Sequence, residues 1–192
     1  MTVRVLRRDL VRKGRVFDFT VENVTFTSGY NLDLEIIRHP GAAAIVPLDD
    51  DNEVLLLKQY RHAVGGLLWE IPAGTFEDGE SSLACAQREL SEETGYTATT
   101  WDSLGAIRPV PGYSDERIQL FLARNLTPAR QNLDPDEIVE VHKMPLDRVT
   151  AMIAGGQIED AKTIAGIFLT LNHLNLGLGG DCPTRSRSTP ER

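Results

Sequence analysis

Cysteine and long apolar runs are scarce in this sequence. Its 192 residues include only two cysteines, Cys85 in a helical pattern and Cys182 in a polar stretch, so we expect no disulfide between them. Such usage is typical of a reducing cytosol, and we expect a cytoplasmic protein. No apolar run approaches the roughly 20 residues of a membrane-spanning helix, and the first residues lack the apolar core of a signal peptide. We therefore expect no membrane partner.

An excess of positive charge is also missing. Twenty Lys and Arg residues stand against 28 Asp and Glu residues, which gives a formal net charge of −8. A nucleic-acid-binding surface needs a basic stripe, so the composition argues against a nucleic-acid partner. A small phosphorylated substrate remains compatible, because a divalent metal and a few Arg or Lys side chains suffice to bind it.

The first 40 residues alternate between apolar and polar positions, as antiparallel strands do. The alternation changes phase near Glu22 and Asn23, which predicts a turn or bulge there. Apolar strands without a covering helix often pair with another chain. We therefore expect residues 1–40 to form a β-meander that serves as the dimerisation element of a homodimer.

Residues 41–176 mix strands and helices, which predicts a layered α/β (α+β) domain. The apolar runs 42–48 and 53–60 flank an acidic turn and are interpreted as a hairpin of buried strands. Further strands are expected near 69–74, 101–108, 116–124 and 138–144, and helices over 80–94, 145–154 and 159–174. Residues 177–192 are rich in Gly, Ser, Thr and Arg, and they predict a disordered tail.

The expected helix 80–94 carries an unusual group of charges. At about 100° per residue, an apolar stripe of Leu83, Ala86 and Leu90 faces the core. The neighbouring stripe holds three glutamates, which are Glu89, Glu92 and Glu93. Like charges at this spacing repel each other, and a cation would neutralise them. Hard oxygen ligands select Mg²⁺, Mn²⁺ or Ca²⁺, although the spacing alone fits a solvated acidic face equally well.

A longer motif decides between these readings. Residues 74–96 match the pattern Gly-x5-Glu-x7-Arg-Glu-Leu-x-Glu-Glu-x-Gly-apolar. The matching positions are Gly74, Glu80, Arg88, Glu89, Leu90, Glu92, Glu93, Gly95 and Tyr96. This segment resembles the signature of the Nudix hydrolase family, and nine positions in one window make the resemblance specific.

The resemblance implies a Nudix-type α/β/α sandwich with a mixed sheet, which hydrolyses nucleoside diphosphates linked to another moiety. Carried over by motif position, Glu89 and Glu93 are the principal metal ligands, with Glu92 and the carbonyl of Ala73 as further ligands. Arg88 braces the helix together with Glu80, and with Glu92 it counts among the catalytic residues. The implied cofactor is Mg²⁺, with Mn²⁺ as the alternative ion.

Segments outside the motif resemble the ADP-ribose pyrophosphatase branch of the family. They are His39-Pro-Gly-Ala, Gln59-Tyr-Arg, Trp69-Glu-Ile-Pro-Ala-Gly, Pro111-Gly-Tyr-Ser-Asp-Glu-Arg and Asp160-Ala-Lys-Thr-Ile-Ala-Gly. By this resemblance the substrate-binding residues are Arg61, Glu70, Glu116 and Pro111. Glu116 would bind the terminal ribose, and Arg61 the adenine or the phosphates. The alternatives are that Pro111 only forms a turn and that Arg61 is a surface charge.

The branch also implies a catalytic base on an acidic loop beyond the motif. Glu137 is the candidate, because a mobile acidic loop before a strand suits a base, and Asp136 and Glu140 are rivals. Pro135 departs from the usual pattern and leaves the register open.

The expected activity is hydrolysis of ADP-ribose to AMP and ribose 5-phosphate. The alternative within the same chemistry is another nucleoside diphosphate sugar, such as GDP-mannose. The alternative from another class is a non-catalytic nucleotide-binding module, but such modules usually lose motif carboxylates, and all are present here.

Overall fold

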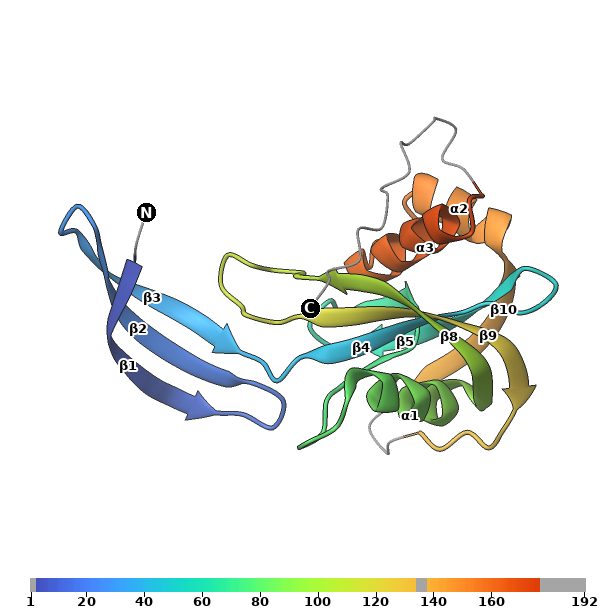
Figure 1. The fold of residues 1–192 in the computed structure, drawn as a ribbon, viewed down its shortest axis with the longest axis horizontal. Helices are drawn as coiled ribbons and strands as arrows, with labels where there is room; N and C mark the ends of the chain where they lie inside the picture. The colour runs from blue at the N-terminus through green and yellow to red at the C-terminus, as the bar shows by residue number, and fades with distance from the viewer. Residues whose placement is uncertain (1–2, 134–137, 177–192) are drawn as a thin grey trace, which may run out of the picture.

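The computed structural model describes residues 3–133 and 138–176, and within them it has ten strands and three helices (Figure 1). The first three strands, β1 (Val3–Lys13), β2 (Asp18–Phe26) and β3 (Asn31–Arg38), form a separate antiparallel sheet in the order β1-β2-β3. This sheet projects from the remainder of the molecule (Figure 1). The structure thus contains the predicted antiparallel meander.

The turn or bulge predicted at Glu22 and Asn23 is wrong. The ladder between β2 and β3 runs without a break, and the register shifts lie instead on β1, next to Val5 and Leu10. The apparent change of phase arises because Glu22 occupies an inward-facing position and is only 3% exposed. Its charge is balanced by Arg8 on β1 and Arg38 on β3. In the sequence pattern, a charged residue at this inward position is mistaken for one that faces solvent.

The other strands form two sheets. They are β4 (Ala42–Pro47), β5 (Glu53–Arg61), β6 (Gly66–Glu70), β7 (Ala73–Thr75), β8 (Tyr96–Ile107), β9 (Ile118–Pro128) and β10 (Val139–Pro145). One sheet has the order β7-β4-β9-β8 and the other the order β10-β5-β6. β4 and β9 run parallel, whereas the other pairs in these two sheets are antiparallel.

The predicted hairpin of 42–48 and 53–60 is also wrong, although both strands exist and are buried. β4 bonds β7 and β9, β5 bonds β6 and β10, and one isolated bridge, Leu48 to Val54, joins the two segments. Each strand finds two partners from elsewhere in the chain, so the acidic turn carries the chain from one sheet to the other.

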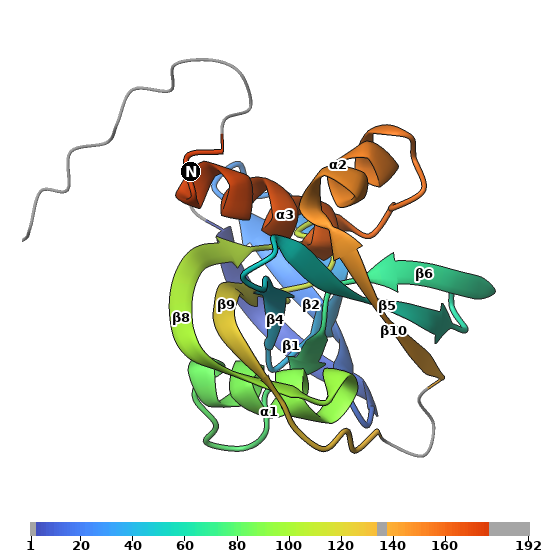
Figure 2. The same cartoon turned by 90° about the vertical axis from the view of Figure 1, so that its right-hand side faces the viewer.

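Helices cover the sheets from opposite sides (Figure 2). α1 (Ser82–Thr94) lies on one side, and α2 (Leu146–Ala154) and α3 (Ala161–His173) lie on the other. α3 approaches β4 closely at Gly166, where an added Cβ would lie 3.0 Å from both Val46 and Ile71. This arrangement confirms the predicted mixed α+β sandwich. None of the helices in the described part of the chain is long and apolar enough to cross a membrane.

Candidate functional site

The ends of α1 are set by local capping. The Ser81 hydroxyl accepts a hydrogen bond from the Ala84 N–H at 3.2 Å, and Gly95 closes the helix in the left-handed region at φ 73°. The predicted helix is therefore confirmed. Its predicted apolar stripe is correct for Ala86 and Leu90 but wrong for Leu83, which is 38% exposed. The helix packs on β4 and β7, and as a result Cys85 lies on its buried face in place of Leu83.

Cys85 lies beneath the carboxylates and is fully buried. Burial raises the pKa of the Cys85 thiol, and the negative charges of Glu89 and Glu80 raise it further, to about 12. Its sulfur lies 3.4 Å from the carbonyl oxygen of Gly74. This cysteine is a packing residue and has no role as a nucleophile, because the thiolate is the reactive form.

The three motif glutamates of α1 differ in their surroundings, and two of them, Glu89 and Glu93, contact β7. Glu93 is 2% exposed and accepts a hydrogen bond from the Ala73 N–H at 2.8 Å. The Glu89 carboxyl lies so close to Gly74 that any side chain at position 74 would overlap it. Glycine is therefore required at this position if the carboxylate is to rest against the backbone.

Arg88 holds the outer carboxylates together. Its guanidinium donates to Glu80 at 3.0 Å, to Glu89 at 2.6 Å and to Glu92 at 3.1 Å. The hydrogen bonds that Arg88 donates to Glu80, together with the negative charge of Glu89, raise the pKa of Arg88, so it stays a cation. The pair with Glu92 spans one turn of α1, and the pairs with Glu80 and Glu89 extend it.

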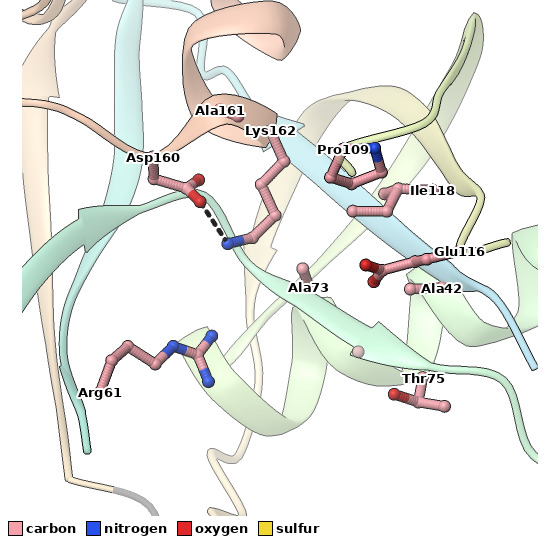
Figure 3. A pocket seen from close by; sticks show the side chains of 11 residues that line it. Ala42, Arg61, Ala73, Thr75, Pro109, Glu116, Ile118, Asp160, Ala161 and Lys162 are labelled. Carbon is pink, nitrogen blue, oxygen red and sulfur yellow. Dashed lines mark hydrogen bonds and ion pairs between the residues drawn. The ribbon is translucent and has the colours of Figure 1, made fainter. Parts of the chain in front are cut away.

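Two adjoining cavities form a cleft beside these residues. The larger, about 450 Å³, is lined by Glu89, Glu92 and Arg88, among others, and its described lining does not include Glu93. The second, about 330 Å³, is lined by Glu116, Pro109 and Lys162, among others (Figure 3). Both share the walls formed by Arg61, Ala73, Gly74 and Thr75. The carboxylates of Glu89 and Glu92 on α1 and the carboxylate of Glu116 therefore face two parts of one cleft.

A buried charge network fixes Arg61 at the junction of the two cavities. Arg61 donates two hydrogen bonds of 2.7 Å to the Glu70 carboxylate, and Lys162 from α3 pairs with Glu70 and with Asp160. Burial alone would raise the pKa of Glu70, but Arg61 and Lys162 outweigh it and lower that pKa. Arg61 thus lines the cleft, whereas Glu70 is buried behind it.

The structure places the remaining predicted site residues as follows. Glu116 lines the second cavity, with one carboxyl oxygen 4.0 Å from the His39 ring. Pro111 lies in an exposed turn outside the described lining, and Pro109 lines the cavity in its place. Glu140 is exposed on β10 and contacts His142. Glu137 and Asp136 lie outside the described residues, as does the predicted tail 177–192.

Sequence reasoning missed Pro109, Asp160 and Lys162 as lining residues. The signal for the last two was the stretch Asp160-Ala-Lys-Thr, which was noted without a role for its charges. No local pattern connects that stretch to Arg61, because the two meet only when α3 packs beside β6.

A second acidic group lies outside the cleft. Among the described residues, Asp49, Asp51 and Glu53 bring carboxylate oxygens within 4.8 Å of one another. The Asp49 carboxylate caps the turn by accepting the N–H groups of Asp51 and Glu53, and Lys143 neutralises Asp49 and Glu53 at 2.5 and 3.0 Å. These contacts account for the three carboxylates as parts of a capped turn, with Lys143 as a counter-ion. Glu89 and Glu92 of α1, in contrast, line a cleft beside Ala73 and Gly74.

Comparison with known proteins agrees with this geometry. An ADP-ribose pyrophosphatase of Bacillus subtilis (strain 168) is 36% identical over 166 residues, covering 85% of this chain and 90% of that protein. A GDP-mannose pyrophosphatase of Cronobacter sakazakii is 31% identical over 175 residues, covering 82% and 88%. A crystal structure of an ADP compounds hydrolase superposes with a TM-score of 0.80 at 23% identity, covering 91% of this chain and 95% of that one.

The family model described as the NUDIX domain matches residues 38–166. That segment contains α1 with its three glutamates and most of the residues that line the cleft. The chain therefore belongs to the NUDIX domain family, as its motif predicted.

Proposed function

We propose that this protein is a metal-dependent pyrophosphohydrolase that converts ADP-ribose to AMP and ribose 5-phosphate. The observation that carries the proposal is the divided cleft, in which Glu89 and Glu92 of α1 line one cavity and Glu116 lines the other. A substrate with a pyrophosphate in its centre and a ribose at one end matches this separation. The similarity to ADP-ribose pyrophosphatases supports the same choice.

The residues around Gly74 fit a divalent metal. Carboxylates of Glu89, Glu92 and Glu93 and the carbonyl of Ala73 form a set of hard oxygen donors, which suits Mg²⁺, with Mn²⁺ as the alternative. The absence of a side chain at Gly74 leaves the Glu89 carboxylate beside the backbone. Bound ions would neutralise the pyrophosphate and lower the pKa of a coordinated water.

The protein's own side chains supply the other functions. Arg61, held by Glu70 at the junction of the cavities, donates hydrogen bonds to the phosphates. Glu116 accepts hydrogen bonds from the hydroxyl groups of the terminal ribose. Arg88 keeps Glu89 and Glu92 in place. Glu137 is our candidate for the general base, with Asp136 and Glu140 as rivals.

A panel of nucleoside diphosphate sugars tests the proposal. We expect AMP release from ADP-ribose with Mg²⁺ to exceed GMP release from GDP-mannose, measured by ion-exchange chromatography. A preference for GDP-mannose would establish the alternative, which the Cronobacter sakazakii relative favours. Hydrolysis in ¹⁸O-water identifies the phosphorus that is attacked, because the label enters only one product.

A pair of substitutions tests the metal site. Glu93→Gln removes a motif carboxylate and should lower turnover by at least about 100-fold. Glu53→Gln removes a carboxylate from the second acidic group and should leave turnover unchanged. Full activity of Glu93→Gln would show that the metal assignment is wrong. If no substrate of the panel were hydrolysed by the wild type, a non-catalytic binding module would be indicated.

We further propose that the protein is a cytoplasmic homodimer that pairs through residues 1–40, with residues 41–176 as the Nudix domain. β1 is exposed along its whole length and bears the apolar side chains Val3, Val5, Leu6, Leu10 and Val11. Five exposed apolar side chains on one strand support an interaction with another chain.

A further inference from the structure

The loop between β8 and β9, which carries Glu116, is attached to the last strand of the N-terminal sheet. This loop extends toward β3 (Figure 1). The Ile37 N–H donates to the Tyr113 carbonyl at 2.8 Å, and the Asp115 N–H donates to the Ile37 carbonyl at 3.2 Å. Ile37 and Ser114 form a parallel bridge. The loop thus adds a short segment to β3 rather than standing free in solvent.

The side chain of Asp115 strengthens this attachment through both carboxylate oxygens. One accepts the His39 N–H at 2.8 Å, and the other accepts the Arg38 guanidinium at 2.9 Å. Partial burial alone would raise the pKa of Asp115, but the hydrogen bonds from Arg38 and His39 lower it. Asp115 is therefore an anion that binds the end of β3 at two points.

Arg38 is itself held in place. Its guanidinium binds Glu22, whose buried carboxylate also accepts the Arg8 Nε at 2.7 Å. Each strand of the N-terminal sheet therefore contributes one member of this network, Arg8 from β1, Glu22 from β2 and Arg38 from β3. Because a planar guanidinium bound on two sides has little freedom to rotate, its orientation is set by the N-terminal sheet.

The backbone around Glu116 is anchored on both sides. The Glu116 N–H donates to the Ser114 hydroxyl at 3.1 Å, and the following carbonyl, of Arg117, accepts the Ala42 N–H at 3.0 Å. With Asp115 fixed on β3 and Arg117 fixed on β4, the Glu116 carboxyl is directed into the cavity opposite Lys162 and Arg61 (Figure 3).

We propose that Asp115 and Arg38 are positioning residues that hold Glu116 for recognition of the ribose diol, so that the N-terminal sheet helps to determine sugar specificity. This inference rests on the proposed function for the identity of the sugar. The attachment of the loop to β3 is a physical property that can be measured without turnover.

The test combines steady-state kinetics with hydrogen exchange. Asp115→Asn keeps the shape and an acceptor for the His39 N–H, but it removes the charge that binds Arg38. We expect KM for ADP-ribose to rise about tenfold with kcat changed less than about threefold, because only sugar binding is weakened. Amide exchange in residues 110–117, measured by mass spectrometry, should become faster.

Asp102→Asn is the matched control. Asp102 pairs with Arg124 at 2.8 Å, and the exposure of that pair, 29% and 39%, resembles the 38% and 32% of Asp115 and Arg38. The pair joins β8 to β9 outside the described lining of the cleft. We expect neither KM nor exchange of residues 110–117 to change.

The double variant Asp115→Asn/Glu116→Gln distinguishes positioning from direct binding. If Asp115 acts through Glu116, the double variant should have nearly the KM of Glu116→Gln alone. Three results would each overturn the inference: additive effects of the two substitutions on KM, an unchanged KM for Asp115→Asn, or a raised KM with unchanged exchange.

The outcome also separates this inference from the proposed function. If the wild type prefers another nucleotide sugar, the proposed substrate is wrong, and the same series of variants with that sugar decides whether Asp115 positions Glu116. If the wild type hydrolyses no nucleotide sugar, amide exchange alone tests the attachment of the loop to β3. Unchanged exchange in Asp115→Asn overturns the attachment, and faster exchange supports the attachment without a catalytic role.

Discussion

Arg88 and Gly74 show how single residues create the site. The Arg88 guanidinium donates hydrogen bonds to oxygen atoms of four residues, which are the carboxylates of Glu80, Glu89 and Glu92 and the Thr75 carbonyl. It offsets the repulsion among carboxylates that the helix places on one face. Gly74 matters because it has no side chain, since the Glu89 carboxyl occupies the space that a side chain would need. Both residues belong to the motif, and the contacts give the physical reason for their identity.

Gly74→Ala is expected to lower metal-dependent turnover by about 100-fold, because the new Cβ would displace the Glu89 carboxyl. Turnover should recover in part at high Mg²⁺, since the loss is one of metal affinity. The measurement is activity as a function of Mg²⁺ concentration. Gly112→Ala is the control, because a Cβ at Gly112 meets nothing within 4 Å, and it should behave as the wild type.

At the scale of elements, the helix α1 and the strand β2 contrast with each other. The ends of α1 follow from Ser81 and Gly95, which act locally, and so the prediction of its limits was close. β2 carries a glutamate on its inward face, and the alternation of its sequence misled the prediction of a turn. The difference is that a cap is satisfied within a few residues, whereas Glu22 is satisfied by Arg8 and Arg38 from other strands.

Glu22→Gln is expected to destabilise the protein by about 2 kcal/mol at pH 7, because it removes one charge from a buried network with partly exposed partners. Burial alone would raise the pKa of Glu22, but Arg38 and Arg8 lower it. A lowered pKa in the folded state means that this stabilisation is present above the unfolded value of about 4.3 and is lost as the pH falls through the folded value.

Urea unfolding at pH 7 and pH 3 measures this effect. The difference in the free energy of unfolding between wild type and Glu22→Gln should shrink at pH 3. Glu35→Gln, on the exposed face of β3, should change it by less than about 0.5 kcal/mol at either pH. A difference that grew toward low pH would contradict the sign of the pKa shift.

At the scale of the whole molecule, the cleft is assembled from segments far apart in the chain. Arg61 comes from β5, Gly74 from β7, Glu89 from α1, Glu116 from the β8–β9 loop and Lys162 from α3. The N-terminal sheet contributes through β3, which holds the β8–β9 loop. We therefore expect a change in that sheet to affect the site, even though the sheet lies at one end of the molecule (Figure 1).

Leu10→Arg tests the proposed pairing through the N-terminal sheet. Leu10 is exposed on β1, and a charge there should shift the protein from dimer to monomer at micromolar concentration, because an unpaired charge would be buried in the interface. Light scattering after size-exclusion chromatography measures the mass. Val64→Arg, at a similarly exposed apolar position between β5 and β6, should leave the mass unchanged. A monomeric wild type would exclude the dimer.

The sequence by itself determined the features that depend on neighbours in the chain. The 3.6-residue period placed Glu89, Glu92 and Glu93 together, the caps limited α1, and the nine motif positions identified the family. Only the tertiary structure decided that β4 and β5 lie in different sheets, that Leu83 is exposed, and that Lys162 and Arg61 share Glu70. These features depend on contacts between distant segments, for which a local pattern carries no signal. The three glutamates were therefore predictable, whereas the contact of Asp115 with Arg38 beside Glu116 required the folded chain.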